Sequence, residues 1–314
     1  MSRPFEIPII GYRRNLHLFS GNGSYLGGLY LNKPSVITNE DLYDFCGHFL
    51  LFPSSNYRWR LHRLGPNNSF HEYIPRNSGH LTPGRYVALG NTSQVIDIGI
   101  SSERPMPRIP THQPSTSHLG PNQLHLRDTL RARDHRCAIT GISSPTARPF
   151  TGLIACHIFP VARHRIWLSN HYQRWITDTT NPNLIGPNGI FSAQNGILLS
   201  TQAHVYFDTF MIAVNPDRGY RIISLVEDIL GVGGRRLSAT TRPNNDPNTR
   251  VSIDALRWHF HQAILTHMRG VGTTFWDLDS AGGDYMGMVL DDPDAAEIME
   301  IEMGNRLTAY VQVS

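Results

Sequence analysis

The feature that most constrains how this chain can fold is a short apolar run that leads directly into an amphipathic helix. Residues 195–200 read NGILLS, which is typical of a short buried strand. Ser200 stands where a helix N-cap is expected, just before the segment TQAHVYFDTF. His204 and Asp208 are four residues apart in that segment, and a helix places such side chains on one face. The sequence therefore predicts a strand and a helix that present an imidazole and a carboxylate together.

A second apolar run lies upstream of this segment. Residues 153–160 read LIACHIFP, a strand that Pro160 ends because proline cannot donate to a strand ladder. Residues 137–142, CAITGI, read as the strand before it, closed by a Thr-Gly turn. His157 would project from this hairpin, directly after Cys156. Since a neutral imidazole can accept a proton from water near neutral pH, His157 is a candidate general base.

The order His157, Asn195, His204, with nine residues from the asparagine to the second histidine, resembles the ββα-metal motif of HNH endonucleases. It is similar in particular to fungal proteins that carry one such domain in mid-chain, and the resemblance covers roughly residues 124–225. It implies a small hairpin and a helix that hold one divalent cation beside a general base. On this resemblance His157 is the base, Asn195 fixes the loop and orients the base, and His204 binds the metal. An Asn-Gly turn is the purely local interpretation of Asn195.

The resemblance also bears on the remaining metal ligands. Asp208 stands where some relatives of the colicin DNase type carry another histidine. Nitrogen and oxygen ligands together suit Mg²⁺, Mn²⁺, Zn²⁺ or Ni²⁺, and the motif implies no organic cofactor. Cys156 departs from the family pattern, because many HNH enzymes have Asp or His at this position as a further ligand. A thiolate there would favour Zn²⁺, whereas a buried cysteine that only fills the core is the alternative.

Charge is distributed unevenly, although the formal net charge is only +3. Between Leu124 and Arg174 there are eight arginines against two aspartates, whereas from Asp277 onward there are nine acidic residues and one arginine. Arginines suit phosphate contacts, so DNA is the expected partner, and a polarised solvated surface is the alternative. The candidate phosphate contacts near the motif are Arg136, Arg163, Arg165 and Arg174.

The rest of the chain is predicted to be organised around this motif in an α+β fold. Short strand-like runs, with one helix predicted over 39–52 from Asn39 as N-cap, indicate a β-rich N-terminal domain, and their order fits a β-grasp-like module. Five prolines and few large apolar residues indicate a linker, and helical periodicity marks the C-terminal part. The predicted divisions are 1–102 (β-rich domain), 103–122 (linker), 123–245 (HNH nuclease-like domain) and 246–314 (helical extension packed on it). Helices are predicted over 122–136, 251–268 and 292–311.

Three general features limit the possible classes of protein. The chain has no run of 18 apolar residues, so no membrane span is predicted, and its N-terminus lacks the pattern of a secretory signal. The three cysteines, Cys46, Cys137 and Cys156, are far apart in sequence, which argues against a disulfide framework. A reducing compartment follows, so we expect an intracellular protein, cytoplasmic or nuclear.

These observations support three hypotheses for function. The first is a hydrolase, a metal-dependent HNH endonuclease that cleaves phosphodiester bonds in DNA, with His157 as base and a cation on His204 and Asp208. A homodimer is a further expectation, because HNH nickases that cut both strands often work as dimers. The second is a repurposed HNH fold that acts on a small molecule, as in fungal secondary metabolism, with His157 as acid or base. The third is a binding module without catalytic activity.

Overall fold

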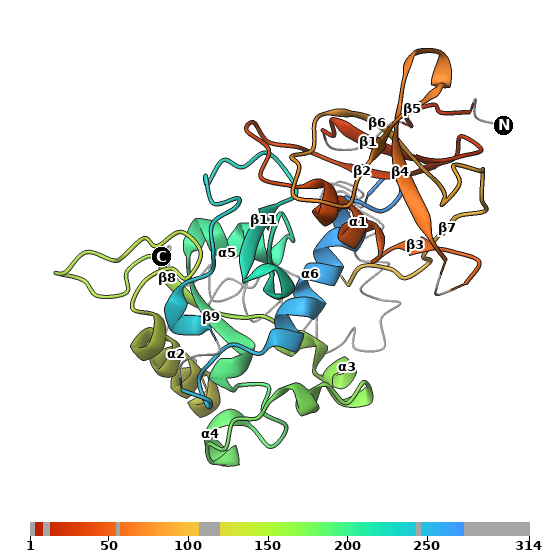
Figure 1. The fold of residues 1–314 in the computed structure, drawn as a ribbon. Helices are drawn as coiled ribbons and strands as arrows, with labels where there is room; N and C mark the ends of the chain where they lie inside the picture. Colours follow the sequence, from red (N-terminus) through yellow and green to blue (C-terminus); the bar gives the residue numbers. More distant parts are fainter. Residues whose placement is uncertain (1–3, 9–12, 55–56, 107–119, 243–245, 273–314) are drawn as a thin grey trace, which may run out of the picture.

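The computed structural model describes residues 4–8, 13–54, 57–106, 120–242 and 246–272 (Figure 1). The predicted helix over 292–311, the acidic run from Asp277 and residues 107–119 of the predicted linker lie outside these ranges. Helices and several separate sheets are both present, so the predicted α+β class is confirmed. Within the described ranges, every helix is too short or too polar to cross a membrane.

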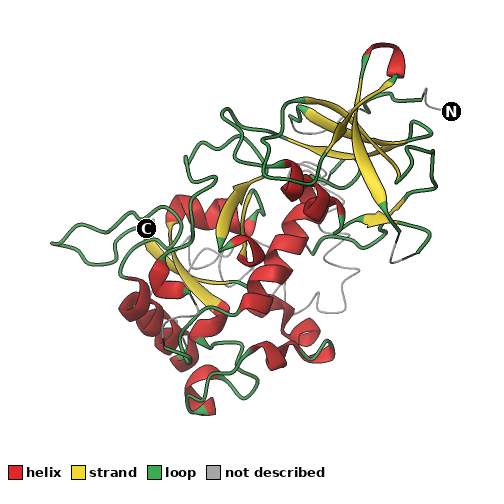
Figure 2. Cartoon of the chain, in the orientation of Figure 1, coloured by secondary structure: helices red, strands yellow, loops and turns green. Residues whose placement is uncertain are grey.

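Strand-rich and helix-rich parts occupy opposite ends of the molecule in Figure 1. The five-stranded N-terminal sheet is at the upper right, and α6 (Ile253–His267) runs from it toward the helix-rich part at the lower left. Figure 2 shows the same division by element type, with most strands at one end and most helices at the other. The helix-rich part contains α2 (Pro121–Asp134), β8 (Leu153–His157), α3 (His164–Ser169), α4 (Pro182–Ile185), β9 (Gly196–Ser200) and α5 (Thr201–Asp208).

The N-terminal sheet has the strand order β2-β1-β6-β4-β5. Its two central neighbours β1 and β6 are parallel, and the other neighbours are antiparallel. In the edge strand β5 four of the five residues are exposed, and the alternating apolar pattern that marks a half-buried strand in sequence is missing. The strands are β1 (Leu16–Ser20), β2 (Tyr25–Leu29), β4 (Trp59–Leu64), β5 (Phe70–Ile74) and β6 (Gly84–Gly90), and a separate pair joins β3 (Leu50–Leu51) to β7 (Gly99–Ile100).

Helix α1 (Asn39–Cys46) packs on this sheet, and it is shorter than the predicted helix over 39–52. Its N-cap is Thr38 rather than Asn39: the Thr38 hydroxyl accepts from the Asp41 N–H at 3.2 Å, and the Asp41 carboxylate accepts from the Thr38 N–H at 2.8 Å. This reciprocal capping box fixes where the helix starts. After Gly47 the chain turns, and Leu50 pairs with Ile100 instead of continuing the helix.

One apolar core joins the N-terminal sheet to α6. The cluster contains Leu18 and Phe45 from the N-terminal part together with Phe210, Ile223 and Phe260 from later in the chain. Phe45 and Phe260 meet edge to face at 5.5 Å. Backbone contacts add to this, since the Gly28 N–H donates to the Met268 carbonyl at 2.9 Å. Separating the two parts would therefore expose a continuous apolar surface to water.

The predicted hairpin of 137–142 with 153–160 is wrong. Strand β8 pairs antiparallel with β9, which brings His157 opposite Gly196. Residues 137–142 instead form a turn, in which the Cys137 N–H donates to the Ile142 carbonyl at 2.8 Å and the Gly141 N–H donates to the Cys137 carbonyl at 2.9 Å. From this turn the Ala138 N–H donates to the Leu198 carbonyl of β9 at 2.8 Å. The chain between β8 and β9 carries α3 and α4, and a second antiparallel pair, β10 (Ile212–Asn215) with β11 (Arg221–Ser224), follows α5.

Two histidines meet where the N-terminal part contacts α6. His48 Nδ1 lies 3.0 Å from His261 Nδ1, and His261 Nε2 lies 3.0 Å from both carboxylate oxygens of Glu103. Burial, and next the charge of His261, lower the pKa of His48 to about 4, although Asp44, Asp217 and Glu103 oppose the shift. The folded state therefore favours neutral His48, whereas the unfolded chain takes up a proton near pH 6.5.

Stability is consequently expected to fall with acidification. The contribution of His48 is fully present above pH 6.5 and is lost as the pH falls from there toward 4, because the unfolded state then binds more protons. In urea unfolding, His48→Gln should reduce the loss of stability between pH 7 and pH 5 by about 1–2 kcal/mol relative to the parent. The exposed His71, changed to glutamine, is the control. An unchanged pH dependence in His48→Gln would contradict this assignment.

Candidate active site

Asn195 is fastened to the chain that directly follows His157. Its side-chain oxygen accepts from the Phe159 N–H at 2.8 Å, and its amide nitrogen donates to the carbonyls of Phe159 at 3.1 Å and Ile190 at 3.0 Å. Its backbone carbonyl accepts from the Ile158 N–H at 2.8 Å. The side chain is 0 % exposed. The asparagine therefore fixes the backbone next to His157 through several hydrogen bonds, as well as ending a short 3-10 turn (Ala193–Asn195).

His157 and its neighbour Cys156 point to opposite sides of β8, as alternation in a strand requires. Cys156 is 3 % exposed, packs in the apolar cluster that contains Leu198 and Phe207, and its thiol faces the Ile154 carbonyl at 3.4 Å. His157 is half-buried, and its ring meets that of Phe191 edge-on, with centroids 5.6 Å apart. The His157 imidazole and the Cys156 thiol therefore occupy different environments, although the two residues are adjacent in sequence.

The predicted pairing of His204 with Asp208 is present in the structure. Both are buried on one face of α5, and His204 Nε2 lies 2.8 Å from Asp208 Oδ2. The helix begins as predicted at Ser200, whose hydroxyl accepts from the Ala203 N–H at 3.4 Å. The imidazole and the carboxylate are therefore held as a pair, side by side on the helix.

A complete metal centre is not assembled from the residues described. Among them, no three His, Cys, Asp or Glu side chains are grouped so as to hold a metal ion. Cys156 lies in the apolar cluster, and the pair on α5 has no third ligand of these types within the described ranges. The structure thus brings His204 and Asp208 together and does not add Cys156 to them as the third member of a cluster.

The four candidate phosphate contacts fall into two groups. Arg136, just after α2, Arg165 in α3, and Arg174 in the turn Tyr172–Trp175 are exposed. Arg163 is only 4 % exposed. A surface phosphate can therefore approach the first three, whereas it cannot approach Arg163 in this conformation.

The loop before β9 is held by further buried polar side chains that sequence reasoning missed. Gln194 accepts from the Thr177 N–H at 2.7 Å and donates to the Thr177 hydroxyl at 3.0 Å and the Pro247 carbonyl at 2.7 Å. Its backbone carbonyl accepts from the N–H of Ser252, the N-cap of α6, at 2.8 Å. The one signal in the sequence is three polar residues among the four that precede an apolar strand: Ser192, Gln194 and Asn195.

Helix α6 holds the C-terminal end of α5 with two histidines. His259 Nε2 donates to the Phe207 carbonyl at 2.9 Å, and the two rings stack 3.6 Å apart. His267 Nε2 donates to the Thr209 carbonyl at 3.2 Å, and burial lowers the pKa of His267 to about 4. Both therefore satisfy carbonyls that a helix end leaves without intrahelical partners. The helix that carries His204 and Asp208 is thus fixed at both of its ends.

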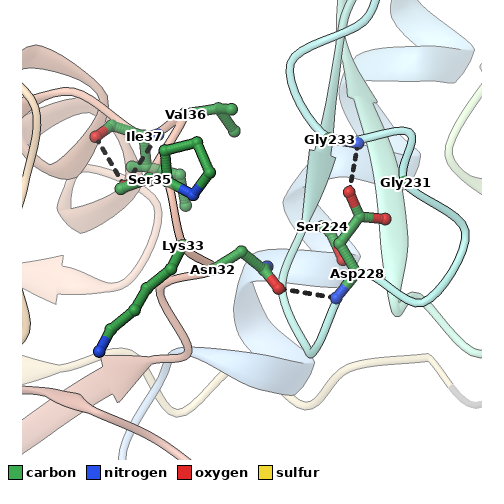
Figure 3. A pocket seen from close by; sticks show the side chains of 10 residues that line it. Asn32, Lys33, Ser35, Val36, Ile37, Ser224, Asp228, Gly231 and Gly233 are labelled. Carbon is green, nitrogen blue, oxygen red and sulfur yellow. Dashed lines mark hydrogen bonds between the residues drawn. The ribbon is translucent and has the colours of Figure 1, made fainter.

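A pocket of about 300 Å³ lies away from these residues, between the loop that leaves β2 and the loop after β11. Figure 3 shows Asn32 and Asp228 facing one another, with the Asp228 N–H donating to the Asn32 side-chain oxygen at 2.7 Å. The Asp228 carboxylate accepts from the Gly233 N–H at 2.7 Å, and Lys33 extends away from it. The predicted site residues do not line this pocket and lie instead in the β8–β9–α5 region.

Comparisons with known proteins agree with that location. No curated protein and no solved structure matches the chain. A kinship with fungal proteins in particular stays a prediction. The family model described as HNH endonuclease matches residues 137–215, the segment that carries His157, Asn195, His204 and Asp208.

Proposed function

We propose that this chain is a metal-dependent HNH endonuclease that hydrolyses phosphodiester bonds in DNA. The observation that carries the proposal is that Asn195 is hydrogen-bonded to the backbone of Phe159, two residues after His157. Both residues lie within the segment that the family model matches. A residue held in this way fixes where a neighbouring base points, which general base catalysis requires. The buried pair on α5 supplies metal-binding groups in the same segment.

His157 is the proposed general base. Its neutral imidazole takes a proton from the water that attacks phosphorus. Phe191 packs against the ring, and Asn195 holds the chain that leaves β8, so the imidazole is oriented before substrate binds. The exposed Arg136, Arg165 and Arg174 neutralise phosphates of the bound strand and set its position.

His204 and Asp208 are the proposed metal ligands. Nε2 and Oδ2 contact each other at 2.8 Å, so the two residues would offer a nitrogen and an oxygen to one cation once that contact opens. Water and phosphate oxygens would complete the coordination of a cation held by these two residues, as is usual for Mg²⁺. Cys156 is not included, because its thiol lies in the apolar cluster. A bound divalent cation would neutralise charge on the phosphate and the leaving oxygen.

Nicking of supercoiled plasmid DNA tests this proposal. We expect the purified protein to nick plasmid with at least one of Mg²⁺, Mn²⁺, Ni²⁺ or Zn²⁺ and to stop when EDTA is added. His204→Ala and Asp208→Ala should need a metal concentration higher by roughly 10–100-fold or more, since even changes behind the ligands weaken metal binding by that factor. Val205→Ala, on the exposed side of the same helix, is the control. Nicking that continues undiminished in EDTA would refute the metal role.

A metal-free enzyme on a repurposed HNH fold is the second candidate. It is favoured by the direct contact of His204 with Asp208, because a carboxylate that orients an imidazole is also a common acid–base arrangement. Elemental analysis of the purified protein, combined with the plasmid assay, separates the two. Absence of bound metal together with no nicking under any of the four ions would favour the small-molecule reaction.

We also infer that residues 1–102 form a β-grasp-like domain, followed by a linker over 103–122, a nuclease-like domain over 123–245 and an extension over 246–314. The parallel pairing of β1 with β6 at the sheet centre, with α1 after the first hairpin, supports the first assignment. The contacts of α6 with β10 support the packing of the extension on the nuclease-like part.

A further inference from the structure

A buried ion pair ends helix α2 beside the turn that carries Asn195. The side chains of Arg133 and Asp134 are 5 % and 0 % exposed. Arg133 Nε donates to Asp134 Oδ1 at 2.7 Å, and Nη2 donates to Oδ2 at 2.8 Å, so the guanidinium grips both carboxylate oxygens. Such a planar, two-point contact fixes orientation as well as distance.

The same two side chains reach the backbone on both sides of Asn195. Arg133 donates to the Ala193 carbonyl at 2.9 Å and to the Gly196 carbonyl at 2.9 Å. Asp134 Oδ2 accepts from the Leu198 N–H at 2.9 Å. Three backbone positions of the 3-10 turn and of β9 are therefore fixed to the end of one helix.

A third contact ties in the segment before α6. Arg133 also donates to the Thr249 carbonyl at 2.6 Å. Thus one guanidinium holds the loop before β9, the strand itself and the segment that leads to α6. The Ala193 carbonyl also accepts from the Gly196 N–H, so the guanidinium adds a second hydrogen bond at that position of the turn.

We propose that Arg133 and Asp134 are positioning residues of this active site, which set Asn195 and, through it, His157. The inference rests on the proposed function. Gly196 pairs with His157 across the β8–β9 ladder, and Asn195 bonds to the two residues after His157. A displacement of the turn would therefore displace His157 as well, because the two are connected by directional hydrogen bonds.

Apolar packing by itself does not account for this ion pair. Helix α2 already contacts β9 closely: a Cβ on Gly196 would lie 2.8 Å from Leu130 Cδ1 and 3.2 Å from Leu126 Cδ1. Burying two charges is an inefficient way to strengthen such packing, because desolvation offsets their attraction. The pair adds directional hydrogen bonds to the backbone of Ala193, Gly196 and Leu198. A catalytic loop requires the fixed orientation that such bonds provide.

Two conservative substitutions test the proposal. Arg133→Lys keeps the charge and loses the two-point grip, and Asp134→Asn keeps the shape and loses the charge. On a labelled DNA duplex, with kcat corrected for the folded fraction measured by circular dichroism, we expect kcat to fall roughly 10²-fold, since a displacement of about 1 Å has that effect. KM should stay near the parent value, because neither side chain contacts substrate.

Matched controls come from the same helix. Arg127 and Asp128 form an Arg–Asp pair at adjacent positions, with side chains 16 % and 63 % exposed. Arg127→Lys and Asp128→Asn should leave kcat near the parent value. A similar loss of kcat in these controls would overturn the proposal, because the effect would then not depend on contacts to the turn.

Amide hydrogen exchange is an independent measurement that needs no activity. The N–H groups of Ile158 and Phe159 donate to Asn195, so they should exchange roughly tenfold faster or more in Arg133→Lys and Asp134→Asn, with no change in the controls. If the parent cleaves no DNA, the proposed function fails and the exchange rates still decide the positioning role. Folded variants with parental exchange at both amides would overturn it.

Discussion

Replacing His157 by alanine is expected to reduce DNA cleavage by about 10²–10⁴-fold, the usual contribution of a positioned general base. The methyl group of alanine cannot take the proton from the attacking water, and the ring that contacts Phe191 is lost with the imidazole. His157 is half-buried at the end of β8 and contacts Phe191, so the substitution leaves only a small local gap. Affinities for DNA and for metal should stay near those of the parent, because the arginines and the pair on α5 are untouched.

The measurement is single-turnover cleavage with saturating metal, together with DNA binding followed by fluorescence anisotropy. His171→Ala is the control, since His171 is an exposed histidine in the chain between β8 and β9. A His157→Ala protein that is folded and cuts at the parent rate would exclude His157 as base. A protein that loses DNA binding as well would place His157 in the binding surface instead.

Asp134→Ala is expected to lower the free energy of unfolding by about 3–5 kcal/mol, the typical result of removing one partner of a buried ion pair. Arg133 would keep its charge at 5 % exposure, and the buried N–H of Leu198 would lose its acceptor. Both effects act in the same direction, because a buried charge and a buried donor are each left without the carboxylate.

Urea unfolding followed by circular dichroism measures this change. Asp128→Ala, at an exposed aspartate of the same helix, should alter the free energy of unfolding by only about 0.5 kcal/mol or less. If Asp134→Ala lowered the free energy of unfolding by less than about 1 kcal/mol, the structure would have relaxed around the unpaired Arg133 guanidinium. Such a result would contradict a rigid contact between Arg133 and Asp134. This variant addresses stability, whereas Asp134→Asn isolates the effect on the loop.

Short-range features of the fold could be predicted from the sequence. The helix at Thr201–Asp208, its Ser200 cap and the shared face of His204 and Asp208 all follow from periodicity over one or two turns. Helix α1 was located by the same reasoning, although Thr38 and not Asn39 caps it, because two adjacent residues can both serve as caps.

Pairing between distant segments could not be predicted in this way. The run at 137–142 is as apolar as a strand, and it lies nearer to β8 in sequence than β9 does. Strand partners are chosen by the packing of the whole core, so β8 pairs with β9 beyond an inserted segment that contains α3 and α4. Local pattern alone has no means of recognising such a partner.

The amino-acid sequence by itself determined which side chains of the matched segment carry imidazole, amide and carboxylate, and which of them share a helix face, because those properties depend on residue type and local geometry. Only the tertiary structure decided that the Arg133 side chain is buried against Asp134 beside the turn, that Arg163 is buried while Arg165 is exposed, and that Cys156 packs in the core. The physical reason is that burial and partnership depend on contacts between segments far apart in the chain, and an arginine or a cysteine has the same chemical formula in either environment.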